Sequence, residues 1–347
     1  MSKQSQKGGD KSTNVQGENI TIISGVSYAE VETIALNVFK ANFMELSGDA
    51  AELAIKRAED ITRQFLEKLK TENEEGIANA KDPDFQHALF SVQKNYARTG
   101  DKELGDLLVD LLVDRTKHSE RSLIQIVLKE SLSTAPKLTS DQLAVLSIIH
   151  HFKETVISNI VDIKAFTGIL DRFVEPFSGS ITKSQTCYKH LDFTGCVSTS
   201  IGSTSIEALL QKRYGGLFSR GFTEEELQRR DITTSKYSAL LIKCLHDSDK
   251  MQFFGLSRPI LLDNLSHHGV QEQEAQKLTN LYDSTLMGYA EIKELLLNLC
   301  PYMENVFDVW HGSSMKNVNL TSVGIAIAHA NTKKQCGEFG NLSSWMN

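Results

Sequence analysis

Apolar residues recur at helical spacing along most of this chain, and this periodicity constrains its fold more than any other feature. Between residues 50 and 69 one stripe contains Leu53, Ala54, Ala58, Ile61, Phe65 and Leu69, and the opposite face contains Glu52, Lys56, Glu59, Arg63 and Glu67. An apolar stripe opposite a charged face is typical of a helix that packs by one side. Only five prolines occur among the 347 residues, so few positions must interrupt a helix. We therefore expect a mainly α fold built from multi-helix bundle domains.

Local start signals support this expectation at several places. A Ser or Thr followed three residues later by Glu or Gln forms a capping box, in which each side chain bonds the other residue's backbone N–H. The sequence contains such pairs at Ser27–Glu30, Thr139–Gln142 and Thr223–Glu226. They predict helices that begin near each Ser or Thr. Helical spacing also predicts helices over about 234–246, 270–287 and 289–299.

The N-terminal region has a different character. Residues 1–11 are polar and have nothing to bury, which predicts a disordered tail. Residues 12–23 place a few apolar side chains among Asn, Thr and Gly, which favours a short β element. A single two-stranded hairpin is marginally stable in water, so we expect neighbouring chains to complete this element. The predicted oligomerisation residues are Val15, Ile20, Ile22 and Ile23 of this element, and Val31, Ile34 and Val38 of the helix that follows.

Two further segments depart from helical periodicity. Residues 178–205 are rich in Ser, Thr and Gly and predict a long connection with room for short strands. Near the C-terminus, residues 318–320 predict a short strand that leads into a helix capped by Thr321 or Ser322. The expected domains are a disordered tail at 1–11, a β element with a helical oligomerisation module at 12–70, a helical domain at 84–175, an irregular connection at 176–233, and a C-terminal helical domain with its strand–helix unit at 234–347.

Composition restricts the classes of protein. Hydrophobic residues make up 40% of the chain and charged residues 23%, as in ordinary globular proteins. No apolar run approaches the length of a membrane span, and the start "MSKQSQKGGDKS" lacks the apolar centre of a secretory signal. We therefore expect a cytoplasmic protein. The five cysteines include no CxxC pair, which favours reduced thiols. The net charge of −7 argues against broad capture of nucleic acid.

Candidate chemistry is sparse. His150, His246 and Asp247 resemble the His and His-Asp pattern by which helical phosphohydrolases hold divalent metals. Cys187 lies three residues before His190, and a Cys–His pair is a legitimate nucleophile. Chance supplies both patterns easily, and the sequence contains no phosphate-binding glycine loop and no GxSxG nucleophile motif. We therefore expect no catalytic residues, no metal and no cofactor, and keep a metal- or thiol-dependent hydrolase as an alternative.

A DNA-binding regulator is a further alternative. A strand followed by a helix at the end of the chain resembles part of a winged-helix unit. The final helix, "SVGIAIAHANTKK", is apolar up to Lys333 and Lys334. A recognition helix needs several polar side chains to read base edges. The sequence therefore favours a core helix here.

Two stretches resemble known bacterial families. "GDKSTNVQGENITI", followed by "GVSYAEVETIALNVFKANF", is similar to a Gly-Asp-x-Ser-Thr leader module found on varied bacterial proteins, several of them linked to phage defence. Residues 85–150 and the ending "VNLTSVGIAIAHA" resemble Abi-alpha-type abortive infection proteins. The segment 178–233 departs from that pattern. The resemblance implies assembly in a bacterial cytoplasm and assigns no catalytic residue.

These observations lead to one leading hypothesis for function. We expect an oligomeric, non-enzymatic sensor or scaffold in bacterial anti-phage defence, similar to abortive infection proteins. Its expected partners are further copies of the chain and a phage or host protein. We expect neither nucleic-acid binding nor a membrane span.

Overall fold

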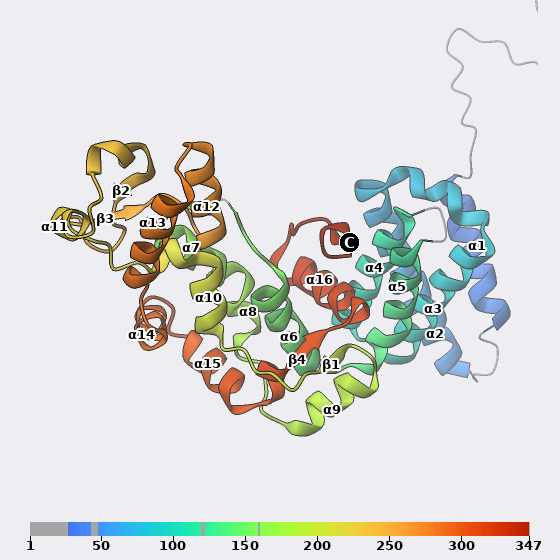
Figure 1. The fold of residues 1–347 in the computed structure, drawn as a ribbon. Helices are drawn as coiled ribbons and strands as arrows, with labels where there is room; N and C mark the ends of the chain where they lie inside the picture. The colour runs from blue at the N-terminus through green and yellow to red at the C-terminus, as the bar shows by residue number, and fades with distance from the viewer. Residues whose placement is uncertain (1–26, 43–47, 119–121, 159, 347) are drawn as a thin grey trace, which may run out of the picture.

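The computed structural model describes residues 27–42, 48–118, 122–158 and 160–346, and within them the protein is mainly α. The N-terminal helices lie at one end of the molecule and a smaller lobe lies at the other (Figure 1). The N-terminal helices are α1 (Tyr28–Asn42), α2 (Gly48–Glu72), α3 (Pro83–Thr99), α4 (Lys102–Thr116) and α5 (Leu123–Thr134), and α6 (Ser140–Ile149) follows them into the middle of the molecule, where it packs against α8 and α16 (Figure 1). The predicted mainly α fold is confirmed.

The middle of the molecule contains helices from both halves of the sequence. These are α7 (Ile163–Phe173), α8 (Glu175–Ser178), α9 (Gln185–Phe193), α10 (Ile206–Tyr214), α14 (Tyr289–Leu299), α15 (Met303–Gly312) and α16 (Ser322–Cys336). The last of them, α16, packs against α4, α5 and α6, and Figure 1 shows it between the two ends of the molecule. The end of the chain therefore completes the core that its beginning forms.

The smaller lobe at the far end has its own apolar core. It contains α11 (Glu224–Gln228), β2 (Leu241–Lys243), β3 (Met251–Phe253), α12 (Arg258–His267) and α13 (Glu272–Thr285). Its buried side chains run from Phe222 to Tyr282 and form a cluster separate from the main core, which extends from Val31 to Leu342. A short π-helical turn lies at 150–154, and short 3-10 turns lie at 74–81, 135–137, 215–218, 234–240, 314–317 and 342–345.

Strands are few and short in the described residues. β1 (Val197–Thr199) pairs antiparallel with β4 (Val318–Leu320), and β2 pairs antiparallel with β3. The predicted strand at 318–320 is confirmed, and Thr321 caps the helix that follows by accepting a bond from the Gly324 N–H. A Cβ atom at Gly324 would lie 1.9 Å from the Cys196 carbonyl oxygen, so only glycine allows α16 to approach β1 this closely.

The predicted capping boxes are present. Ser27 and Glu30 exchange side-chain to backbone bonds at the start of α1. The same reciprocal bonds occur between Thr139 and Gln142 at α6, and between Thr223 and Glu226 at α11. These helix starts are encoded locally, because each pair satisfies backbone N–H groups that the first turn leaves unbonded.

The structure differs from the prediction in three segments. Residues 234–246 do not form one helix, because a 3-10 turn ends at Leu240 and residues 241–243 pair with β3. The connection expected at 178–205 contains α9 as well as β1. Helix α9 was missed because only Tyr188 and Leu191 are buried in it, which is too few to show a period. The stretch between the helical module expected to end at residue 70 and the helical domain expected to begin at residue 84 contains a 3-10 turn in which Ile77 and Ala80 are buried.

Helices α1 and α2 do not stand apart from the rest of the chain. Both pack against α3, and α2 also packs against α4. Ile61 and Phe65 of α2 are 1% and 0% exposed and belong to the main core. The two helices are therefore part of the fold of a single copy, and removing them would expose that core.

A buried charge cluster fastens α16 to the N-terminal helices. The Lys333 ammonium lies 2.5 Å from the Glu72 carboxylate, 3.6 Å from Asp110 and 3.9 Å from Asp114. Burial alone would lower the pKa of Lys333, but the three carboxylates together raise it. Burial raises the pKa of Asp110, although Lys68 lies 2.6 Å away. These ion pairs favour one arrangement of α16 against α2 and α4, because separating the helices would leave unpaired charges in the protein interior, which is energetically costly.

Candidate functional site

The predicted oligomerisation residues fall into two groups. Val15, Ile20, Ile22 and Ile23 lie outside the described residues. In α1, Val31 is 1% exposed and belongs to the core of its own chain, while Ile34 and Val38 are half-buried beside α3. The apolar stripe on α1 thus packs against the core of its own chain. A contact between copies at α1 would involve only the exposed parts of the Ile34 and Val38 side chains.

The histidines proposed as metal ligands have other surroundings. His150 is fully buried at the end of α6, where its ring lies 5.0 Å from that of Trp345 and 6.5 Å from that of His329. His246 follows β2, and its Nε2 lies 2.5 Å from the Leu217 carbonyl oxygen. Among the described residues, no three His, Cys, Asp or Glu side chains are grouped so that they could hold a metal ion.

The histidines at the end of α6 form a neutral, buried cluster. Burial lowers the pKa of His150 to about 3 and that of His151 to about 4, and the neighbouring charges of His329 and Arg213 act in the same direction. Phe339 and Trp345 of the C-terminal segment cover the cluster, and the Trp345 indole N–H donates to the Glu154 carbonyl oxygen at 3.2 Å. These rings pack the C-terminal segment onto the core.

The structure gives no activated thiol at the second candidate. Cys187 lies in α9, and burial raises its pKa to about 11, with Asp141 adding to the rise. The His190 Nδ1 atom lies within 3.2 Å of the Gln142 side chain, which holds the ring. A nucleophilic cysteine needs a lowered pKa, so this arrangement opposes thiol catalysis.

The C-terminal helix also lacks the surface that DNA reading needs. Residues 326–332 of α16 are all buried. The polar residues among them, His329, Asn331 and Thr332, are only 3–4% exposed. The Asn331 amide donates to the Ser147 hydroxyl inside the protein at 3.0 Å. His329, Asn331 and Thr332 of α16 therefore face the interior, which agrees with the core helix that the sequence favours.

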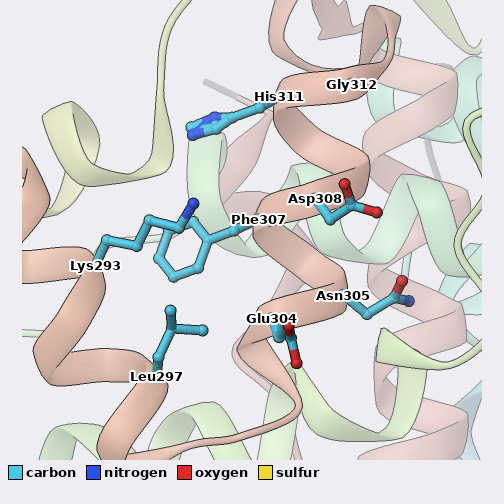
Figure 2. Close-up of a pocket in the computed structure, with 8 residues that line it drawn as sticks. All are labelled: Lys293, Leu297, Glu304, Asn305, Phe307, Asp308, His311 and Gly312. Atoms are coloured by element: carbon cyan, nitrogen blue, oxygen red, sulfur yellow. The ribbon is translucent and has the colours of Figure 1, made fainter.

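One polar pocket of about 760 Å³ lies between α14 and α15 (Figure 2). Lys293 reaches into it from α14, and its ammonium lies 5.4 Å from the centre of the Phe307 ring. His311 of α15 faces it, and the His311 Nε2 lies 3.1 Å from an oxygen of Glu207 in α10. Glu207 is 5% exposed, so a buried carboxylate orients the imidazole and favours a proton on Nε2.

The two sides of this pocket differ in charge. Figure 2 shows the Lys293 side chain on the same side of α15 as His311, while Asp308 and Asn305 point the other way. Asp308 is paired with Lys183 at 2.7 Å, and the Asn305 amide donates to the Ser178 carbonyl oxygen. Lys293 can donate to a small polar group in the pocket, the His311 Nδ1 atom can accept from it, and Glu304 adds a carboxylate to the lining. No Ser, Thr, Cys or Tyr side chain is among the residues that line the pocket.

A second surface is apolar and lies where the smaller lobe meets the segment after α6. We call it the apolar surface and define it by six exposed side chains: Val156, Val161, Ile242, Phe254, Ile260 and Leu262. They line two hollows of about 600 and 400 Å³, which share Leu256 and Ile260. Val161 is 76% exposed and Phe254 is 56% exposed. Sequence reasoning missed this surface because its residues come from separate elements and form no periodic stripe.

An apolar surface of this kind indicates a binding face. Single exposed apolar residues are ordinary, but a contiguous group around a hollow is typical of a surface that a partner covers. Basic side chains lie close by, since Lys212, Arg213 and Arg258 line the larger hollow. Of these, Arg258 is paired with Asp283 at 3.2 Å.

Within the described residues, no helix is both long and apolar enough to cross a membrane. Comparison with curated proteins and with solved structures found no match. One family model matches residues 25–346, which is most of the chain, and its description names no activity. The chain therefore belongs to this family, whose function is unknown.

Proposed function

We propose that this protein is an oligomeric, non-enzymatic sensor or scaffold in bacterial anti-phage defence. The observation that carries the assembly part is the apolar surface, whose six side chains are 36–76% exposed. Burying such side chains contributes roughly 25 cal/mol for each Å² of apolar area removed from water. A partner that covers the two hollows therefore gains a substantial driving force.

The alternative chemistries receive less support from the geometry. Burial raises the pKa of Cys187 to about 11, and His246 is engaged by the Leu217 carbonyl. In the final helix, His329, Asn331 and Thr332 are buried and cannot reach a base edge. A scaffold needs none of these groups to be reactive, which is why we prefer it.

The sensor part of the proposal is assigned to the polar pocket between α14 and α15. His311 is oriented by the buried Glu207 and lies on the same side as Lys293. This pair offers a site for a small polar trigger that carries both an acceptor for the Lys293 ammonium and a donor for the His311 Nδ1 atom, because the Nε2–H group of His311 already donates to Glu207. His311→Ala removes half of the pair without touching the apolar surface.

The assembly part is tested by light scattering on the purified full chain. We expect a mass above that of one copy at micromolar concentration, and a lower mass after deletion of residues 1–26. That deletion leaves α1 and α2 in place, which matters because both belong to the core. A full-length chain that stays strictly monomeric at about 100 µM would refute assembly.

The defence part rests on the resemblance to abortive infection proteins, and it is tested separately. Bacteria that express the chain should plate phages less efficiently than bacteria with an empty vector. An assembly-deficient variant and His311→Ala are the two informative comparisons. Equal plating on wild-type and empty-vector cells across a broad phage panel would remove this part and leave the assembly proposal standing.

A further inference from the structure

Strand β2 has an open edge. Among the residues that the structure describes, β2 pairs with β3 on one side only, and Phe222 bridges the other side of β3. The Phe254 N–H donates to the Leu240 carbonyl oxygen, and the Cys244 N–H donates to the Lys250 carbonyl oxygen. In this register the even-numbered residues of the β2 chain segment are the ones whose backbone groups bond the β3 side. The backbone groups of residue 243 therefore point away from the sheet, and no described residue bonds them. Such an edge can accept another strand.

The apolar surface begins at this edge. Ile242 of β2 and Phe254, just after β3, are 36% and 56% exposed and line the smaller hollow together with Val161. A peptide that adds to a sheet edge gains affinity from main-chain bonds and specificity from pockets for alternate side chains. The edge and the hollow together provide both requirements.

Residues 20–23 have the pattern that this site selects. The sequence there reads Ile-Thr-Ile-Ile, so Ile20 and Ile22 would share one face of an added strand. Glu18 is the only charged residue between 12 and 23. Lys243, at the open edge, is exposed and takes part in none of the ion pairs between described residues. The charge of the segment thus suits the charge of the edge.

The geometry of the chain assigns this strand to another copy. Residue 23 lies five residues before the start of α1 at Tyr28, and five residues span at most about 18 Å. In Figure 1, α1 is at the opposite end of the molecule from β2 and α12, and helices that include α4, α16 and α10 lie between them. Each helix is about 10 Å thick, so the segment cannot reach β2 of its own copy.

We propose that residues 20–23 of one copy add as a strand to the edge of β2 in the next copy, and that Ile20 or Ile22 fills the hollow beside Ile242 and Phe254. This inference rests on the proposed assembly and names its contact. The contact is head-to-tail, so it joins two different surfaces. Repetition gives a ring if the rotation closes and a filament if it does not.

Complementary variants of the full chain test the contact. Ile22→Asp removes the donor strand's apolar face, and Ile242→Asp removes the acceptor. Ile201→Asp is the matched control, because Ile201 is fully exposed and lines neither hollow. We expect each of the first two variants to weaken self-association at least about tenfold in sedimentation velocity, as expected for a central interface residue, with an unchanged circular dichroism spectrum.

Mixing the variants gives the decisive result. Ile22→Asp keeps an intact acceptor and Ile242→Asp keeps an intact donor, so an equimolar mixture should form 1:1 dimers and nothing larger. A peptide of residues 12–24 should compete with wild-type assembly, and a scrambled peptide should not. If Ile242→Asp and Phe254→Asp assemble like wild type while Ile22→Asp does not, the contact is wrong although assembly stands. If the wild type is monomeric, the proposed function itself fails.

Discussion

Lowering the pH should destabilise this protein through the two histidines at the end of α6. The pKa of His150 is lowered to about 3 and that of His151 to about 4, mainly by burial. In the unfolded chain both have a pKa near 6.5. As the pH falls below about 6.5, the two histidines bind protons in the unfolded state. In the folded state they stay unprotonated, because their pKa values there are lower. The stability is therefore fully present above this pH and is lost below it.

The size of the effect follows from these pKa values. Each histidine contributes a slope that approaches about 1.4 kcal/mol per pH unit once the pH is well below 6.5. Between pH 8 and pH 5, the free energy of unfolding should fall by about 2 kcal/mol for each histidine. The groups that face the two rings are His329 and Arg213, and both oppose a further positive charge.

Tryptophan fluorescence provides a local assay. The sequence has two tryptophans, and the Trp345 ring lies 5.0 Å from that of His150. Urea unfolding is followed at pH 8, 7, 6 and 5 by fluorescence and by circular dichroism at 222 nm. Carboxylates also titrate near the lower limit, so the informative quantity is the difference between the wild type and His150→Leu, which cannot bind a proton at this position.

The two proteins should differ in slope. The wild type should lose about 2 kcal/mol more than His150→Leu between pH 8 and pH 5, whatever their relative stabilities at pH 8. Equal losses in both proteins would refute the reasoning, because they would mean that His150 binds its proton equally well in the folded and unfolded states. His150 would then have to be accessible to water, contrary to its full burial.

Three further outcomes follow from the packing. Gly324→Ala should lower the free energy of unfolding by about 3 kcal/mol in urea titrations, because the new Cβ would lie 1.9 Å from a backbone oxygen. Gly168→Ala is the control and should be neutral or stabilising, because its Cβ would have no atom within 4 Å. Lys333→Met should cost roughly 1–3 kcal/mol, because it removes one cation from the buried carboxylates of Asp110 and Asp114, which keep Lys68 and Lys117 at 2.6 and 2.7 Å. Arg220→Ala breaks an exposed pair and should cost less than about 1 kcal/mol; equal costs would contradict the charge cluster. Cys187, with a pKa of about 11, should react with iodoacetamide at pH 8 at least about 100-fold more slowly than free cysteine, as measured by mass spectrometry, and rapid labelling would revive the thiol alternative.

Where local chemistry decides an element, the sequence was enough to predict it. The capping boxes at Thr139 and Thr223 mark helix starts that the structure contains. The strand at 318–320 and its cap at Thr321 were also predicted correctly. Each cap bonds partners that lie within four residues of each other, so the tertiary surroundings do not alter it. The strand is the exception, because its partner β1 lies at 197–199, and it was predictable because the buried Val318 and Leu320 alternate with the exposed Asn319.

Where distant partners decide, the prediction failed or was absent. Residues 241–243 have an apolar pattern compatible with a helix, but they are extended because they pair with β3. The apolar surface joins Val161 of one connection to Phe254 of another. Neither residue is distinctive in sequence, since an exposed valine and a core valine look alike until the chain is folded.

The sequence alone determined the fold class, the helix starts and the weak case for catalysis, because these depend on composition and on spacings within a few residues. Only the tertiary structure decided which stripes are buried within one copy and which apolar residues remain exposed. Val31 is the clearest example: its spacing suggested a contact between copies, and packing inside one copy buries it. Burial is a property of what lies opposite a side chain, and that neighbour is usually remote in sequence.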